Sequence, residues 1–393
     1  MTSEAVPSRK NDDIEVLRAF AILYTVVLHL QVLLPADSAF LIPITYLDLS
    51  VGVDLFLVIS GFVITSSLIE STRRTAASRR PLMFSFWIKR IFRLLPAAWT
   101  WVIVACAIQL LIVGITDIPY SLRDISLSTA AAMGNVMNIY TPYCIANAGG
   151  QQCLVDNFLG HYWSLSLEEQ FYLVFPFLFF FLSRKSLATL LIAAVLTQLL
   201  WQRPFFTYAW YVKTDALCWG ILLALLADKD FYRQHIPVLF RLPYLAQAAG
   251  LALLVLLPLI AASSQGIVTI MKPYGVALVA MLCAAIVWLA SYDRNVFSVG
   301  RLYQRTMLYI GSRSYSLYLS HLVVYLGTRD LLGYFGKGLA ATIGAAAFNT
   351  LHVVVAMSLT LLGAELTYRF VETIFRARGR VIAARQLQTR HGN

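Results

Sequence analysis

Charged residues are scarce in this sequence: Asp, Glu, Lys and Arg make up only 13% of its 393 residues, whereas 59% are hydrophobic. So little charge cannot surround that much apolar surface in an ordinary water-soluble domain. Heptad repeats, low-complexity tracts and nucleic-acid-binding motifs are absent as well, so no nucleic-acid partner is expected despite the net charge of +11. The composition indicates an integral membrane protein that lipid partly solvates.

Apolar runs of about 17 to 25 residues, the length at which a helix crosses a bilayer, recur along the chain. We expect an all-α, polytopic helix bundle with about ten transmembrane helices. The transmembrane domain is expected over 14–372, between an N-terminal tail at 1–13 and a basic C-terminal tail at 373–393. The expected spans lie near 14–34, 49–70, 94–115, 162–182, 186–201, 208–227, 244–262, 273–291, 307–326 and 338–366.

Lys and Arg residues are distributed unevenly between the two sets of loops. If the N-terminus is cytoplasmic, most of them fall in inner segments such as 73–93 and 369–390, as the positive-inside rule requires. The polar start of the chain precedes a long apolar run without a small-residue cleavage site, so we expect no removable signal peptide. Both termini are therefore expected in the cytoplasm, with the protein in a bacterial inner membrane.

Only five cysteines are present, and two of them, Cys144 and Cys153, fall in the long loop 116–160 that this topology places outside. They form a disulfide if that compartment is oxidising. Two free thiols are an equally good interpretation of the sequence.

The first expected span contains two ionisable residues, Arg18 and His29. Eleven helical steps place them about 20° apart around the helix and about 16 Å apart along it. Ionisable residues at membrane depth are functional candidates because each is costly unless it is paired or hydrated. The alternative is an arginine that reaches the interface and a histidine satisfied in a helix contact.

The second span begins with Asp54, which either serves in a site or interacts with the helix dipole. Gly61, in the same span, is expected to allow close helix packing. A basic cluster, Lys89, Arg90 and Arg93, precedes the third span. It is suited either to anchoring the helix at anionic lipid or to binding the phosphates of a nucleotide-bearing donor.

The fourth span opens with HYWSLSLEEQFY, in which His161, Glu168 and Tyr172 share one helical stripe. Glu169 points about 100° away from Glu168, and we expect it to pair with basic residues of a neighbouring helix. Two further candidates in later spans are Asp215 and His321.

Six elements, in this order, resemble those of the acyltransferase-3 family of membrane acyltransferases. They are Arg18 and His29 with ten residues between them, VGVDLFLVISGF, FWIKRIFRLLP, HYWSLSLEEQFY, SYSLYLSH and YRFVE. The resemblance extends from Leu17 to about Glu372 and is to the membrane-only form, as in exopolysaccharide and O-antigen O-acetyltransferases. Lys89 and Lys213 stand where the family often has Arg, Ser320 stands where it often has Trp, and the proline that often follows the final Glu is missing.

The resemblance implies an enzyme that transfers an acyl group, usually acetyl, from cytoplasmic acyl-CoA to a hydroxyl of a surface carbohydrate or glycolipid. Acetyl-CoA is then a co-substrate, and no bound cofactor or metal is expected. His29 is the expected base, oriented by Glu168 or Asp54, in direct transfer or through an acyl-histidine. Donor phosphates are expected on Arg18, Lys89, Arg90 and Arg93. Acceptor-binding or supporting roles are expected for His161, Trp163, Ser164, Tyr172, Asp215 and His321.

Other functions also fit the sequence. A secondary transporter would use Asp54, Glu168, Asp215 and His29 as a proton or substrate pathway. A non-enzymatic glycan or lipid carrier is a further alternative. An acyltransferase could also act on a small molecule such as a macrolide instead of a polysaccharide. The sequence does not indicate an oligomeric state.

Overall fold

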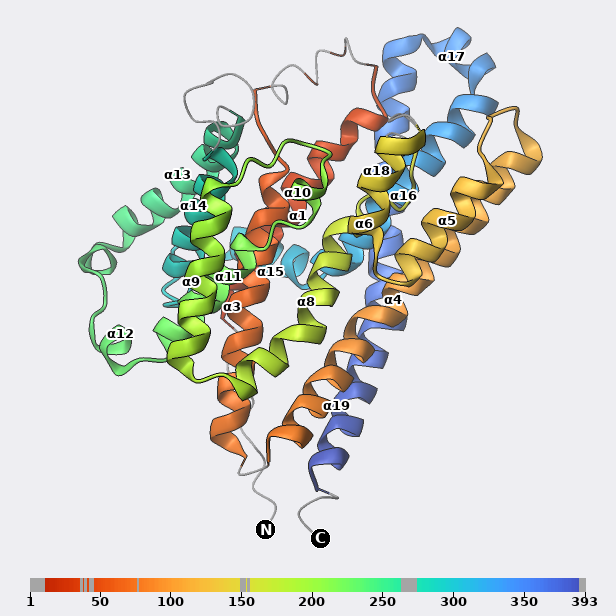
Figure 1. Ribbon diagram of the computed structural model, residues 1–393. Coiled ribbons are helices and arrows are strands. Elements are labelled where there is room, and N and C mark those ends of the chain that lie inside the picture. Colours follow the sequence, from red (N-terminus) through yellow and green to blue (C-terminus); the bar gives the residue numbers. More distant parts are fainter. Residues whose placement is uncertain are drawn as a thin grey trace.

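The computed structural model describes residues 11–35, 38, 41, 46–75, 78–148, 153, 156–262 and 274–388. The outer ends of both expected tails, 1–10 and 389–393, lie outside these residues. Every regular element of the described part is helical (Figure 1). The main helices are α1 (Asp12–His29), α3 (Val51–Arg74), α4 (Arg79–Ile115), α5 (Leu122–Met133), α6 (Met137–Ala148), α8 (Tyr162–Phe181), α9 (Arg184–Leu200), α10 (Tyr208–Tyr211), α11 (Asp215–Ala227), α12 (Asp230–Gln234), α13 (Pro243–Ala262), α14 (Gly275–Ala290), α15 (Arg301–Ser312), α16 (Ser314–Phe335), α17 (Lys337–Ile343), α18 (Ala345–Thr367) and α19 (Thr373–Gln388).

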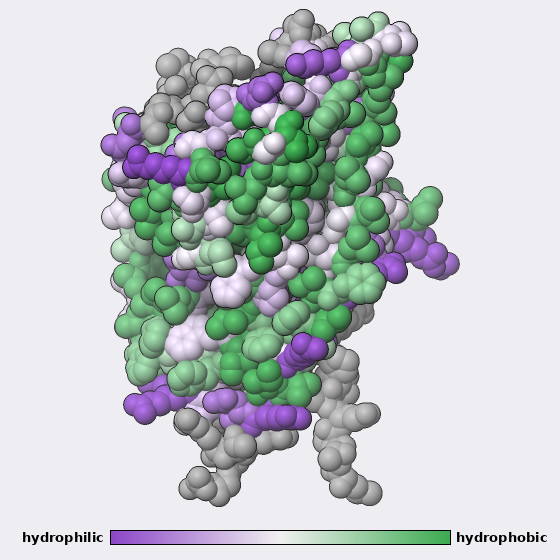
Figure 2. Space-filling model, turned by 90° about the vertical axis from the view of Figure 1, so that its right-hand side faces the viewer, coloured by the Kyte–Doolittle hydropathy of each residue, from purple (hydrophilic) through white to green (hydrophobic). Residues whose placement is uncertain are grey.

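Five helical segments of the described chain are long and apolar enough to cross a membrane. They are Val51–Arg74, Arg79–Ile115, Tyr208–Ala227, Pro243–Ala262 and Ala345–Leu387. On the face shown in Figure 2, hydrophobic residues cover most of the height, and hydrophilic residues gather mainly near the upper and lower ends. Such a belt is the surface that hydrocarbon solvates. The helical, multi-pass character is thus supported, whereas ten spans and cytoplasmic termini stay predictions.

Helix boundaries differ from the expected spans in several places. The expected span 208–227 is divided between α10 and α11, and 338–366 between α17 and α18. The basic cluster before the third span is not a separate segment, because α4 is continuous over 37 residues. The expected span 307–326 crosses a break at Arg313, where α15 ends and α16 begins. The expected C-terminal tail is largely the helix α19, which packs along α4. Gly379 permits this contact, since a Cβ there would lie 2.5 Å from that of Phe92.

The long loop between α4 and α8 contains two helices, α5 and α6, that the sequence analysis did not anticipate. Ser121 begins α5 by accepting a hydrogen bond from the backbone N–H of Asp124. Of the two interpretations of the cysteines, the structure has the disulfide: Cys144 and Cys153 are bonded, with their Cα atoms 5.8 Å apart.

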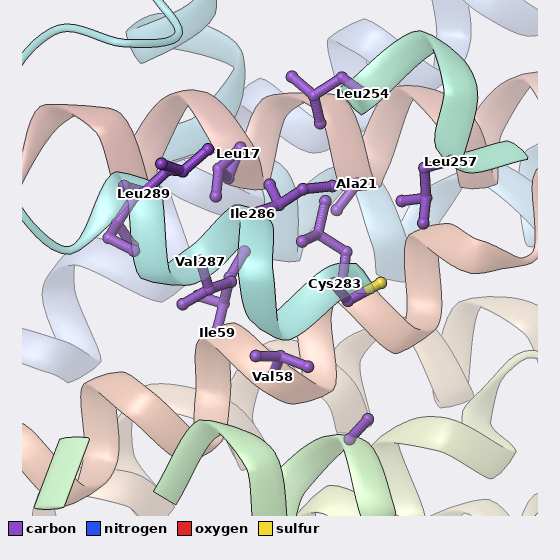
Figure 3. Packing of buried hydrophobic residues seen from close by; sticks show 14 of the residues in the cluster. Leu17, Ala21, Val58, Ile59, Leu254, Leu257, Cys283, Ile286, Val287 and Leu289 are labelled. Atoms are coloured by element: carbon purple, nitrogen blue, oxygen red, sulfur yellow. The ribbon is translucent and has the colours of Figure 1, made fainter. Parts of the chain in front are cut away.

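The largest hydrophobic cluster joins α1, α3, α13 and α14 (Figure 3). Small residues such as Ala21 let these helices approach closely. The residues labelled in Figure 3 are Leu17, Ala21, Val58, Ile59, Leu254, Leu257, Cys283, Ile286, Val287 and Leu289. This cluster fixes α1, and with it the side chains that α1 contributes to the site.

Two glycines set the crossing of α3 and α11. A Cβ at Gly220 would lie 2.1 Å from the carbonyl oxygen of Val58, and one at Gly61 would lie 2.3 Å from that of Leu217. The backbones therefore touch, and the close packing expected at Gly61 is confirmed.

Replacing Gly220 with alanine should destabilise the protein by about 1–3 kcal/mol, because the added methyl must push two backbones apart. The thermal unfolding midpoint of the detergent-solubilised protein measures this effect. Gly333→Ala in α16 is the matched control, since no atom lies within 4 Å of a Cβ there. Equal midpoints for the two variants would show that α3 and α11 accommodate the added methyl group without loss of stability.

Candidate active site

Three histidines from distant parts of the chain meet between α1, α8 and α16. His29 ends α1, His161 directly precedes α8, and His321 lies in α16. The ring centroids of His29 and His321 are 4.9 Å apart, and those of His161 and His321 are 5.1 Å apart. The described residues contain no group of His, Cys, Asp or Glu side chains arranged to hold a metal ion.

Backbone carbonyls fix the protonation of two of these rings. Nδ1 of His29 lies 2.8 Å from the carbonyl oxygen of Thr25, and Nδ1 of His321 lies 2.7 Å from that of Tyr318. A carbonyl only accepts, so we assign the proton of each neutral ring to Nδ1. Nε2 of His321 lies 3.3 Å from Nδ1 of His29 and so faces the N–H of that ring as an acceptor. Nε2 of His29 keeps a free lone pair, as a general base requires.

Tyr318 connects this cluster with α8. Its hydroxyl donates to the carbonyl oxygen of His161 at 2.5 Å and lies 2.6 Å from Oγ of Ser164, which therefore donates to it. Neither ring nitrogen of His161 makes a hydrogen bond within the described residues. His161 and Ser164 are thus brought to the site, as supporting groups around His29 and His321.

A large basic cavity of about 790 Å³ is lined in part by Arg18. Its cationic lining comes from four helices: Arg18 of α1, Arg74 of α3, Lys89 and Arg93 of α4, and Arg376 of α19. Three carboxylates, Glu15, Glu70 and Glu372, also line it, so the cations are in excess. Arg18 is held by Glu15 at 3.1 Å, whereas Nε of Arg93 is buried without a hydrogen-bond partner. Sequence analysis missed Arg376, because it assigned that residue to a tail.

A smaller cavity of about 80 Å³ leads from the basic cavity toward the histidines. Arg18 and Arg93 line both cavities. The smaller one is also lined by Arg90, and it extends to Ser164 and Tyr318. The two cavities therefore adjoin at these arginines, and the smaller one ends at Tyr318, whose hydroxyl donates to the carbonyl oxygen of His161.

Glu168 lines the smaller cavity but does not contact His29. It accepts hydrogen bonds from Ser60 and Tyr172. The guanidinium of Arg90 lies over the ring of Tyr172, 5.3 Å from its centroid. The expected pairing of Glu169 with a basic residue is not formed at Oε1, which is buried without a hydrogen-bond partner.

Asp54 and Asp215 are both neutralised by buried basic residues. Lys213 binds Asp54 at 2.9 Å, and Arg203 binds Asp215 with two contacts of 2.8 Å. All four side chains are at most 4% exposed. A buried charge needs an opposite charge, and α11 brings both pairs together. No hydrogen bond joins His29 to a carboxylate within the described residues, so the expected orienting contact is replaced by that with His321.

The aromatic residues near the outer ends of the spans are mostly packed inside. Trp163 is half-buried and contacts Tyr211 edge to face, with centroids 5.2 Å apart. Tyr162, Trp210 and Tyr211 are 1–4% exposed, and Trp210 also covers the ammonium of Lys213 at 4.0 Å. These three rings therefore pack inside the helix bundle in this structure.

Comparisons with known proteins indicate the family of this chain. Residues 11–369 match the family model for an acyltransferase domain of the acyltransferase-3 type. O-acetyltransferase OatA of Staphylococcus aureus (strain NCTC 8325 / PS 47) is 27% identical over 380 residues, which cover 92% of this chain and 57% of that protein. Peptidoglycan O-acetyltransferase OatA of Listeria monocytogenes is 26% identical over 93% of this chain and 56% of its own length. Putative peptidoglycan O-acetyltransferase YrhL of Bacillus subtilis is 26% identical, with 92% and 54% covered.

The chain thus spans little more than half the length of these relatives. No solved structure matches it. The family match extends from α1 to α18 and includes the three histidines and the smaller cavity, whereas Glu372, Arg376 and Leu387 of the basic cavity lie beyond its end. This chain belongs to the acyltransferase-3 family.

Proposed function

We propose that the protein is a membrane O-acetyltransferase that moves an acetyl group from cytoplasmic acetyl-CoA to a hydroxyl of a surface glycan. The observation that carries this proposal is the pair of adjoining arginine-lined cavities, the smaller of which ends at Ser164 and Tyr318 beside the histidine cluster. Peptidoglycan is the first acceptor to test, because two of the relatives are named for it. Exopolysaccharide and O-antigen are the other surface glycans of this class.

The basic cavity suits the nucleotide end of the donor. Arg18, Lys89, Arg93 and Arg376 supply positive charge around it, and charge-assisted hydrogen bonds to phosphate are among the strongest in proteins. Its size of about 790 Å³ is within the range of cofactor pockets. From Arg18 to His29 the helix rises about 16 Å, which is the reach required of the thiol-bearing arm.

At the histidine end, the proposed reaction needs one base. Nε2 of His29 takes the proton of the acceptor hydroxyl while the oxygen attacks the thioester carbonyl carbon. The C–S bond then breaks, and the leaving CoA thiolate takes the proton back from the imidazolium. His321 stabilises the imidazolium by accepting from Nδ1–H of His29, and Ser164 and Tyr318 keep the start of α8 beside the two rings.

Replacing Arg93 with alanine should raise the KM for acetyl-CoA by about one to two orders of magnitude, because a hydrogen bond to a charged group contributes about 1.5–3 kcal/mol. Arg90→Ala should act in the same direction, since Arg90 lines the smaller cavity. Initial rates at varied acetyl-CoA measure the change. Arg80→Ala is the matched control, because this exposed arginine of α4 lines neither cavity. Unchanged donor constants would identify the cluster as a lipid anchor.

Reconstituted vesicles of known orientation test the whole proposal. Labelled acetyl-CoA is supplied on the side of the basic cavity, and membrane-impermeant glycan is supplied on the other side. We expect label in the glycan, because only the acetyl group needs to pass the helix bundle. Label that reaches the glycan only when both substrates share the cytoplasmic side would contradict transfer across the bilayer.

The transporter alternative is less well supported. It needs Asp54 and Asp215 as free groups in a pathway, but both are held in buried ion pairs. Turnover of acetyl-CoA that depends on an acceptor would distinguish the enzyme from a transporter or carrier.

A further inference from the structure

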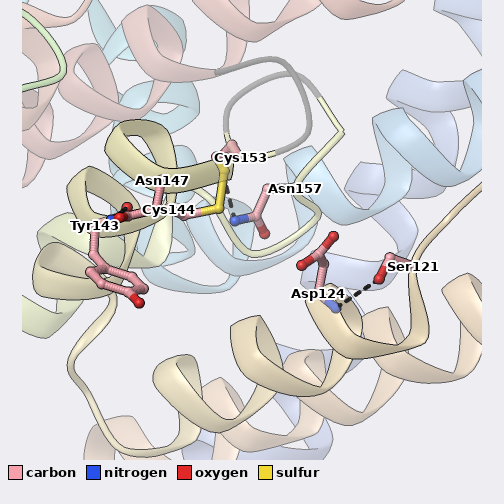
Figure 4. Close-up of a disulfide and its surroundings, with 7 residues drawn as sticks. All are labelled: Ser121, Asp124, Tyr143, Cys144, Asn147, Cys153 and Asn157. Carbon is pink, nitrogen blue, oxygen red and sulfur yellow. Dashed lines mark hydrogen bonds between the residues drawn. A yellow bond between two sulfur atoms is a disulfide. The ribbon is translucent and has the colours of Figure 1, made fainter. Parts of the chain in front are cut away.

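A third cavity, of about 130 Å³, is separate from the two described above. It is enclosed by the end of α4, by α5 and α6, and by the outer part of α16. The disulfide between Cys144 and Cys153 forms part of its wall. In Figure 4, Asp124 projects from α5 into the space beside the disulfide and Asn157.

Gln109 of α4 marks this cavity as a binding site. Its side chain lines the cavity and is 4% exposed, and its Oε1 has no hydrogen-bond partner. A buried amide oxygen without a partner costs about 1–3 kcal/mol. The structure therefore keeps an acceptor directed at a group that the chain itself does not provide.

Another part of the wall is an internally satisfied network. Tyr120 donates to Asp330 at 2.5 Å, and Arg329 binds Asp330 at 2.7 Å and Asp156 at 2.9 Å. Burial and the hydrogen bond to Asp330 raise the pKa of Tyr120, so its phenol stays protonated and keeps donating. The polar groups of this network bind one another, so Tyr120 offers the cavity only its aromatic ring.

The remaining groups select the chemistry of the ligand. Gln109 and Asp124 offer oxygens that accept hydrogen bonds, and the rings of Tyr120 and Tyr140 offer apolar faces. Arg329 neutralises Asp156 within the network, so the carboxylate of Asp124 is the group that disfavours an anion here. An uncharged ligand with several hydroxyl or amide donors on an apolar ring, as in a saccharide, fits this lining.

The position of the cavity separates it from the reacting centre. Arg329 follows His321 by eight residues on α16, which is about 12 Å along the helix. Asn157, which also lines the cavity, precedes His161 by four residues. A sugar held in the cavity is therefore a different unit of the chain from the one acetylated beside His29.

We propose that this cavity is a subsite for a non-reacting sugar unit of a polymeric acceptor, with Gln109 and Asp124 accepting its hydrogen bonds. The inference rests on the proposed function and refines it: the enzyme prefers a glycan chain to a short acceptor. The volume has room for roughly ten water molecules, which one sugar ring can displace.

Acceptor length provides the test. The full chain is reconstituted in vesicles with acetyl-CoA, and peptidoglycan glycan is supplied as a disaccharide or an octasaccharide. Asp124→Asn and Gln109→Met should each raise the KM for the octasaccharide about tenfold, from the loss of a charge-assisted or buried hydrogen bond. The KM for the disaccharide and for acetyl-CoA should not change. Asp117→Asn, an exposed carboxylate of the same loop outside the cavity, is the matched control.

Each other result overturns the inference in its own way. Equal losses with both acceptors would show a structural role for the two residues, and no loss would show that the cavity binds no sugar. Asp124-dependent binding of calcium ions, but not of the octasaccharide, in a calorimetric titration would make it a cation site. A wild-type protein that acetylates neither acceptor would instead contradict the proposed function. If the Gln109→Met variant fails to insert, the Asp124→Asn variant decides the test, because Asp124 is only half-buried.

Discussion

Replacing His29 with alanine is expected to lower acyl transfer by a factor on the order of 10² to 10⁴, the usual contribution of a general base. Nε2 of His29 offers a lone pair free of hydrogen bonds, because the proton of the ring lies on Nδ1, which is held by the carbonyl oxygen of Thr25. Without it, the acceptor hydroxyl must attack while still protonated. Transfer of labelled acetyl to glycan, normalised to inserted protein, measures the loss.

His235→Ala is the control for this experiment. Nδ1 of His235 also contacts a carbonyl four residues earlier, that of Phe231, at 3.0 Å, but the residue is exposed and distant from the site in sequence. It should transfer at the wild-type rate. Near-normal acetylation by a well-inserted His29→Ala variant would remove His29 from the mechanism.

Replacing Lys213 with methionine is expected to destabilise the protein by about 3–5 kcal/mol, because it leaves Asp54 buried without its cation. The unfolding midpoint in denaturant measures this effect. The double variant Lys213→Met, Asp54→Leu should recover most of the stability, since neither charge then remains buried. Arg73→Met is the control: it breaks the pair with Asp228, in which the side chains are 47% and 27% exposed, and should change stability by less than about 1 kcal/mol.

The double variant also tests the expected catalytic role of Asp54. If it is stable and transfers acetyl normally, Asp54 serves only to balance Lys213. If it is stable but inactive, the carboxylate acts in the reaction without a direct hydrogen bond to His29. A single Lys213→Met variant as stable as the wild type would show that water reaches the pair.

Composition and periodicity by themselves determine the class of this protein and the placement of two site residues. Hydrophobic content predicts a helical membrane protein because lipid tolerates only a backbone with internally satisfied hydrogen bonds. The helical period alone places Arg18 and His29 on one face of α1, and the structure keeps both in one helix, with Arg18 at the basic cavity and His29 at the histidine cluster. Both are local consequences of sequence, so they require no knowledge of how the helices pack.

Partners of buried polar groups were decided only by the tertiary structure. His29 and His321 are 292 residues apart, and Lys213 and Asp54 are 159 residues apart, so neither contact follows from spacing along a helix. The sequence shows that a charge at membrane depth must be neutralised, but several opposite charges satisfy that condition equally. Which one does so depends on helix crossings such as that of α3 with α11, where glycine positions set how closely the backbones pack.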